Sequence, residues 1–117
     1  MSQKLLYHIT SAREWHDARR TNCYRSLNFD RDRFIHCCYG HQLLTVAHRF
    51  YGGQHGLVIL VIESSKIETS LIEENLEGGT ELYPHLYSVL PIVAVIDAIA
   101  FPCNADGSFI LPEELNI

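Results

Sequence analysis

The sequence lacks any long hydrophobic run. Its longest uninterrupted apolar stretch, Leu57–Ile62, is far shorter than the roughly 20 residues that an α-helix needs to cross a bilayer. Met1–Lys4 lead into no extended apolar segment, so no signal peptide is expected. We therefore expect a cytoplasmic protein with no membrane partner.

Cysteine is present, but not in the patterns that bind zinc. Cys23, Cys37, Cys38 and Cys103 include no Cys-x-x-Cys pair, and their spacing from the histidines matches no standard zinc motif. A disulfide between the neighbours Cys37 and Cys38 would strain the peptide that joins them. The sequence therefore predicts reduced, mostly buried thiols and no metal site.

Positive charge is scarce overall and unevenly placed. The chain has nine Lys and Arg against 14 Asp and Glu, a net charge of −5, which argues against broad, non-specific nucleic-acid binding. Residues 1–50 hold eight of the basic residues and only four of the acidic ones. The basic half either neutralises the acidic half within the fold or carries a local anion site, and the sequence leaves both interpretations open.

What the chain does contain is the pattern of one small α+β domain covering residues 1–117. Its hydrophobic content of 47% suffices for a core without crosslinks. A Ser-x-x-Glu capping box at Ser11 opens a helix to about Arg20, whose apolar face should include Ala12, Trp15 and Ala18. A second helix is predicted from His41 to Tyr51.

About six short strands are predicted, because several segments are rich in bulky and β-branched residues. Leu57–Ile62 is apolar without alternation and should lie at the centre of a sheet. Residues 81–87 should be extended, and Asn75–Thr80 should form a loop. The other predicted strands are Leu5–Thr10, Phe34–Cys38, Ile67–Glu73, Val95–Phe101 and Ser108–Leu111.

The first of these strands carries a candidate binding pair. Side chains alternate along a strand, so His8 and Thr10 should share one face while Tyr7 and Ile9 face the other way. An imidazole beside a hydroxyl suits sugar hydroxyls, phosphate or an amide. The alternative is a core histidine with a hydrogen-bond partner, and Thr10 as part of the helix cap.

The second histidine strand leads into a helix. Phe34, His36 and Cys38 should share one face, and the helix N-terminus that follows would suit an anion. A nucleophilic Cys38 activated by that N-terminus is a further option. The alternative is again a buried histidine with its hydrogen bonds satisfied.

A third candidate region follows Gly78-Gly79. It gathers Glu81, Tyr83 and His85 beside a flexible glycine pair, and loops of this composition are often functional. Glu81 would orient a ribose hydroxyl or stabilise a cationic transition state. The alternative is a surface turn whose tyrosines pack on the core.

Four motifs, in this order and spacing, resemble the bacterial family catalogued as domain of unknown function 952, over nearly the whole chain. They are Leu6-Tyr7-His8-Ile9-Thr10, Phe34-Ile35-His36-Cys37, Gly79 to Tyr87 with Leu90-Pro91, and Ala105-Asp106-Gly107. That family is similar in fold to the ADP-ribosyltransferase superfamily, and within it the motifs most resemble those of the tRNA 2′-phosphotransferase branch. The resemblance implies two small, mostly antiparallel sheets around an NAD-binding cleft.

By position, the resemblance implies roles for individual residues. His8 would contact the NAD ribose and Thr10 would lie against nicotinamide, while His36 would be the second ligand-contacting histidine. Glu81 would stand where many transferases keep a glutamate. Three features depart from the pattern. Ile9 replaces a glycine, Cys38 replaces a serine, and the arginine pair of the phosphotransferases has no clear match.

Together these observations lead to two functional hypotheses. In the first, a nucleotide-like ligand, with NAD as the leading candidate, binds between the histidine strands, and the reaction is ADP-ribosyl transfer or NAD cleavage. The predicted catalytic residues are then His8, His36 and Glu81, and the predicted ligand contacts are Tyr7, Thr10, Cys38, Tyr83 and His85. In the second, the same fold is a non-catalytic binding or interaction module.

Overall fold

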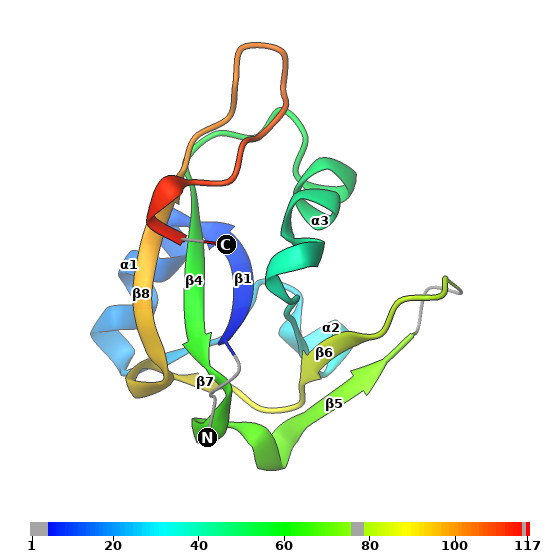
Figure 1. Cartoon of the computed structure of the whole chain (residues 1–117). Coiled ribbons are helices and arrows are strands. Elements are labelled where there is room, and N and C mark those ends of the chain that lie inside the picture. Colours follow the sequence, from blue (N-terminus) through cyan, green and yellow to red (C-terminus); the bar gives the residue numbers. More distant parts are fainter. Residues whose placement is uncertain (1–4, 76–78, 116) are drawn as a thin grey trace.

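A computed structural model describes residues 5–75, 79–115 and 117, and its main element is a three-stranded antiparallel sheet (Figure 1). The strands are β1 (Leu5–Ser11), β4 (Leu57–Glu63) and β8 (Val95–Phe101), in the order β1-β4-β8. β4 is central, as predicted, because both of its faces are covered: Ile59 and Leu60, which point to opposite faces, are fully buried.

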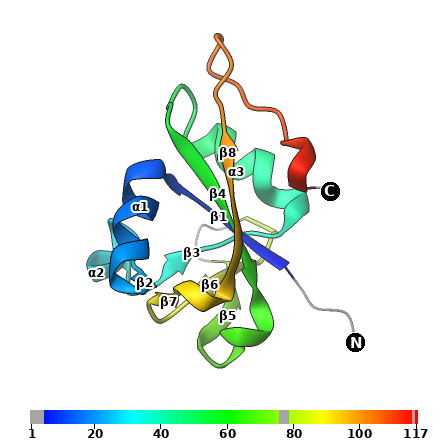
Figure 2. The ribbon, with the colours of Figure 1, turned by 90° about the vertical axis from the view of Figure 1, so that its left-hand side faces the viewer.

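A helix covers each face of this sheet (Figure 2). α1 (Ala12–Thr21) packs on one face through Ala18, and α3 (Leu43–Phe50) packs on the other. The predicted cap of α1 is confirmed, since the Ser11 hydroxyl accepts from the Glu14 N–H at 3.0 Å.

Smaller strand groups lie beside the main sheet. β3 (Ile35–His36), β6 (Tyr83–Leu86) and β5 (Leu71–Glu74) form an antiparallel sheet in the order β3-β6-β5. β2 (Cys23–Tyr24) pairs with β7 (Leu90–Pro91), also antiparallel. Antiparallel pairing throughout confirms an α+β domain with small antiparallel sheets.

One backbone bridge ties the two larger sheets together. The Tyr7 N–H donates to the Cys38 carbonyl and the Cys38 N–H donates to the Tyr7 carbonyl, both at 2.8 Å. β1 and the chain that leaves β3 are thereby held in contact. This bridge brings the two histidine strands to one place.

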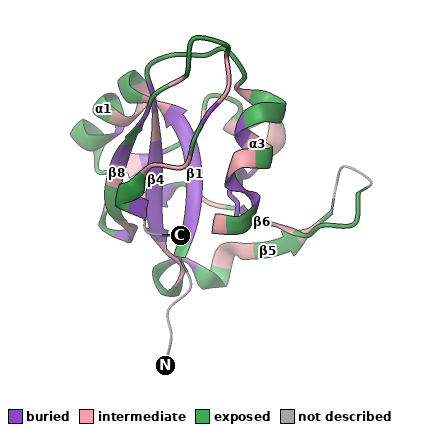
Figure 3. Ribbon diagram, turned by 45° about the horizontal axis from the view of Figure 1, so that its top comes forward, coloured by how far each residue is buried: buried purple, intermediate pink, exposed green. Residues whose placement is uncertain are grey.

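Alternation along β1 and β4 divides the core into two clusters, and Figure 3 shows both strands as largely buried. Tyr7 and Ile9 point into the cluster beneath α3. Leu6 points into the cluster beneath α1, and His8 and Thr10 share its side of the strand, as predicted. Residues of the first cluster include Leu43, Ala47, Ile59, Phe101, Phe109 and Leu115.

Several predicted elements are shorter than expected. The predicted strand Phe34–Cys38 is reduced to β3, and Ile67–Glu73 is a strand only from Leu71. The second helix begins at Leu43, after a 3-10 turn. The 3-10 turns of the described residues are Gly40–Gln42, Ser64–Lys66, Glu68–Ser70, Ile92–Ala94 and Glu113–Leu115.

Other predictions are wrong. Ser108–Leu111 is not a strand, because the Phe109 N–H donates to the His48 ring at 3.0 Å and not to a neighbouring strand. Ala12 is exposed: it is the first residue of α1, and its backbone N–H donates to the Gly56 carbonyl. The predicted loop Asn75–Thr80 includes residues 76–78, which lie outside the described residues.

Sequence patterns also missed three short elements. These are β2, β7 and α2 (Phe29–Asp32), each only two to four residues long. Runs of this length contain about one period of a strand or a helix, which is too little to show a repeating pattern. Among the helices that the structure describes, none is long and apolar enough to span a membrane.

Candidate functional site

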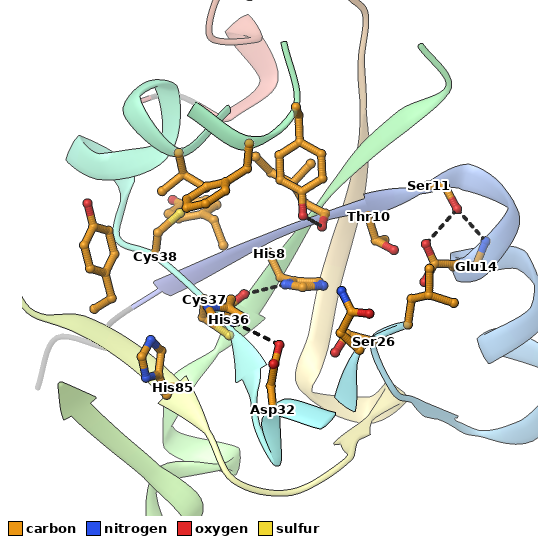
Figure 4. Close-up of a pocket in the computed structure, with 18 of the residues that line it drawn as sticks. His8, Thr10, Ser11, Glu14, Ser26, Asp32, His36, Cys37, Cys38 and His85 are labelled. Atoms are coloured by element: carbon orange, nitrogen blue, oxygen red, sulfur yellow. Dashed lines mark hydrogen bonds and ion pairs between the residues drawn. The ribbon is translucent and has the colours of Figure 1, made fainter. Parts of the chain in front are cut away.

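A cavity of about 650 Å3 lies where β1, β3 and residues 24–32 meet (Figure 4). Both histidine strands contribute to its wall, through His8 and Thr10 on β1 and His36 on β3. Its volume falls within the range of roughly 300–1,000 Å3 that is typical of small-molecule sites. The structure therefore brings the two strands singled out by sequence to one concave surface.

His8 is buried at the centre of this wall, and both of its ring nitrogens have partners. Nδ1 lies 2.5 Å from the His36 carbonyl oxygen, and Nε2 lies 2.8 Å from the Tyr24 hydroxyl. Burial lowers the pKa of His8 to about 4, although the hydrogen bond to the His36 carbonyl opposes this shift. The ring is therefore neutral at pH 7.

Neutrality fixes the direction of the hydrogen bonds. A carbonyl oxygen only accepts, so Nδ1 of His8 carries the ring proton and Nε2 accepts from the Tyr24 hydroxyl. Tyr24 and Thr10 lie 2.8 Å apart, oxygen to oxygen, and either hydroxyl of such a pair can donate. Because the Tyr24 proton is used on His8, Thr10 donates to Tyr24. The lone pairs of the Thr10 oxygen then remain to accept from a ligand.

A second histidine of the wall, His36, is half exposed. Its Nε2 lies 3.3 Å from Asp32 at the end of α2. Arg31 also contacts Asp32, at 2.9 Å from its Nε, and this hydrogen bond is the largest cause that lowers the pKa of the Asp32 carboxyl. Asp32, His36 and Arg31 all line the cavity.

His85 is the third histidine of the wall, and it lies next to His36 across the β3–β6 pairing. Its Nδ1 donates to Glu74 on β5 at 2.9 Å, and the Tyr87 hydroxyl donates to the same carboxylate oxygen at 2.5 Å. These bonds, that of Tyr87 first, lower the pKa of Glu74. Phe34 stacks on the His85 ring, with centroids 4.2 Å apart.

Acidic side chains outnumber basic ones on the cavity wall. Three carboxylates line it, from Glu14, Asp32 and Glu74, whereas Arg31 is the one Lys or Arg among the described lining residues. The basic first half of the chain thus does not form a cluster of arginines here. Arg25, for example, pairs with Asp30 at 2.5 Å on the surface.

Glu81 lies apart from the described residues of this wall. Its carboxylate accepts from the buried side chain of Gln42 at 2.8 Å and lies 3.6 Å from His41 Nε2. Gln42 also donates to the Leu82 carbonyl at 2.9 Å, so it ties this segment to the start of α3. Glu81 is therefore held against the 3-10 turn and not beside His8 or His36.

The remaining predicted contacts have different environments. Tyr7, Cys38 and Tyr83 line the cavity, but Tyr7 and Cys38 are almost completely buried. Burial raises the pKa of the Cys38 thiol to about 12, so the thiolate needed for nucleophilic attack is not populated at neutral pH. Among the described residues, no three His, Cys, Asp or Glu side chains gather where a metal ion could be held.

Sequence patterns missed several residues of the site. No motif marked Tyr24, Asp32 or Glu74, and Glu14 was expected only to help cap α1. Tyr24 and Asp32 belong to residues 21–33, which have no periodicity. Their place in the wall depends on how β2 and α2 pack in three dimensions.

Comparisons with known proteins found similar solved structures and a matching protein family. No curated protein matches the chain. The crystal structure of protein CC0527 from Caulobacter crescentus is similar, with 32% identity, a TM-score of 0.87, and coverage of 97% of this chain and 99% of that one. The solution NMR structure of CC0527 is also similar, with 32% identity, a TM-score of 0.81, and coverage of 94% and 95% of the two chains. The model of a protein family of unknown function, DUF952, matches residues 9–98, and this chain belongs to that family.

Proposed function

We propose that the cavity binds a nucleotide-like small molecule of the NAD type, and that the protein acts on it by ADP-ribosyl transfer or NAD cleavage. The observation that supports this proposal is the meeting of both histidine strands on one wall of a cavity of about 650 Å3. The resemblance to ADP-ribosyltransferases suggested NAD, and the chemistry of the wall allows a more detailed assignment.

The acidic wall fits one end of NAD better than the other. Nicotinamide carries a positive charge in NAD, and the ribose gains positive charge as its bond to nicotinamide breaks. Carboxylates such as Glu14 and Asp32 would stabilise that charge. We therefore assign the nicotinamide ribose to the acidic wall and the diphosphate to the neighbourhood of Arg31.

The predicted residues take unequal parts in this proposal. Thr10 would accept a hydrogen bond from a ribose hydroxyl or the carboxamide, because its own proton is used on Tyr24. His8 would act indirectly, by holding the Tyr24 hydroxyl to which Thr10 donates, since both ring nitrogens of His8 are already hydrogen-bonded. Glu81 could reach the ligand only if its segment released Gln42. A carboxylate of the cavity wall, such as Glu14 or Asp32, therefore takes the role of stabilising positive charge that the sequence suggested for Glu81.

Ligand binding is tested by thermal unfolding with and without millimolar NAD. A ligand at 100 times its dissociation constant adds about 2.7 kcal/mol to the free energy of unfolding, which raises the midpoint by several degrees. Thr10→Val, which is nearly isosteric, should reduce the shift, whereas Thr45→Val on α3 serves as the matched control. No shift with NAD would overturn the proposal.

A non-catalytic binding module is the second candidate, and the environment of His8 supports it. The His8 ring is buried and neutral, and both of its nitrogens bond to other residues of the protein, so its role can be structural without any part in catalysis. The two candidates differ in one measurement. Release of nicotinamide from bound NAD would identify a transferase or hydrolase, and binding without release would identify the module.

A further inference from the structure

The contact between His85 and Glu74 has the geometry of a histidine oriented by a carboxylate. A carboxylate only accepts, so the proton of a neutral His85 ring lies on Nδ1, 2.9 Å from Glu74. The lone pair of the ring is then on Nε2. A fixed tautomer of this kind is the state in which imidazole takes up a proton from a reacting group.

Neighbouring side chains hold this pair in place. Phe34 stacks on the His85 ring at a 16° interplanar angle, and Tyr87 donates to the Glu74 oxygen that His85 contacts. His85 and Glu74 stand on the paired strands β6 and β5, and both residues line the cavity. The pair is thus built into a sheet and not into a mobile surface loop.

The other two histidines of the wall are less suited to accept a proton from a substrate. His8 has both nitrogens engaged and a pKa lowered to about 4. Nε2 of His36 faces Asp32, which also contacts Arg31. Among the described residues, the hydrogen-bond partner of His85 is the Glu74 carboxylate, on one ring nitrogen.

We propose that His85 is the general base of the proposed transfer reaction, and that Glu74 is a positioning residue that acts through it. This inference rests on the proposed function. The bond between ribose C1′ and the nicotinamide nitrogen breaks, and its electron pair neutralises the pyridinium ring. The oxygen of water or of an acceptor hydroxyl bonds to C1′, and its proton passes to Nε2 of His85.

The groups around His85 come from β5, β3 and the segment after β6. Its ring contacts Glu74 on β5, and the Tyr87 hydroxyl donates to the same carboxylate. The His36 ring on β3, which contacts Asp32, lies 5.2 Å from the His85 ring.

The test compares His85→Gln and Glu74→Gln with the control Glu73→Gln, whose side chain contacts Tyr39. Nicotinamide release is followed at pH 7, and the dissociation constant of NAD is measured separately. We expect kcat to fall by about 100-fold or more in His85→Gln, with a dissociation constant within about threefold of the wild-type value. Glu74→Gln should lower kcat by a smaller factor, again with a dissociation constant close to that of the wild type.

Each outcome decides the inference. A His85→Gln protein that keeps its kcat overturns it, as does an unchanged kcat in Glu74→Gln if His85→Gln does not fold. If the wild-type protein binds NAD without releasing nicotinamide, the role of His85 as general base is overturned but the proposed binding of NAD stands. A wild-type protein that does not bind NAD overturns both the inference and the proposed function.

Discussion

His8 and His85 line the same cavity, but their surroundings differ in one respect. The partners of His8 are a carbonyl and a hydroxyl, which are uncharged, whereas His85 contacts the carboxylate of Glu74. Both side chains are buried. Uncharged partners offset little of the cost of burying a positive charge, so the His8 ring stays neutral, whereas the Glu74 carboxylate fixes the proton of a neutral His85 ring on Nδ1.

The difference separates two tasks within one site. His8 links three segments, because it contacts the carbonyl of β3 and the tyrosine of β2 while standing on β1. His85 stands on β6, the central strand of the sheet β3-β6-β5, and contacts the carboxylate of Glu74 on β5. We infer that His8 holds the cavity together and that His85 supplies proton transfer, and the following predictions separate the two.

The largest expected effect is the loss of stability in His8→Ala. The substitution leaves a cavity and removes the partners of a buried carbonyl and a buried hydroxyl. We expect the free energy of unfolding to fall by about 3–5 kcal/mol, measured by urea denaturation at pH 7. A loss below about 1 kcal/mol would show that His8 does not link the strands.

Acidification should weaken the fold through the same residue. The pKa of His8 is about 4 in the folded state, below its ordinary value of 6.5, so the unfolded chain binds the proton more readily. The contribution of neutral His8 is complete above pH 6.5 and is lost as pH falls towards 4. Between pH 7 and pH 5 the loss is about 2 kcal/mol.

Denaturation at both pH values, with His8→Gln as the control, isolates this effect. The glutamine cannot titrate, so the variant should lose less stability than the wild type over the same interval. Equal losses in the two proteins would assign the pH dependence to other groups.

Tyr24→Phe should have a smaller effect. The ring remains in the core while the hydroxyl between His8 and Thr10 disappears. We expect a loss of about 1–2 kcal/mol in urea denaturation. In addition, the Thr10 hydroxyl loses the oxygen to which it donates, so the midpoint shift caused by NAD should change as well if Thr10 binds the ligand.

The smallest effect is expected for Glu81→Gln. Glu81 is more than half exposed and contacts Gln42 and His41 outside the described cavity wall. Its substitution should change the free energy of unfolding by less than about 0.5 kcal/mol and leave NAD binding unaltered. A large loss of binding would return Glu81 to the catalytic role that the sequence suggested.

Sequence patterns predicted the strands of the main sheet and its helices because these depend on local signals. The apolar run of β4, the bulky residues of β1 and the cap at Ser11 each contain their signal within a few residues. Alternation also placed His8 and Thr10 on one side of β1, where both contact Tyr24.

The rest of the site depends on contacts between distant segments. Tyr24 reaches His8 from a two-residue strand, and Glu74 reaches His85 across a sheet, so neither is marked by nearby residues. Glu81 lies close to His85 in sequence, but the amide of Gln42 holds it elsewhere. The sequence alone therefore indicated the histidines and not their partners.

The protonation state of His8 tests the division between the two histidines most directly. Long-range nitrogen–proton correlation spectra of the imidazole rings distinguish the tautomers and the charged form. The account predicts a neutral His8 with its proton on Nδ1 at pH 7, and a ring that remains mostly neutral at pH 5. A His8 ring protonated on Nε2 at pH 7, or fully charged at pH 5, would contradict it.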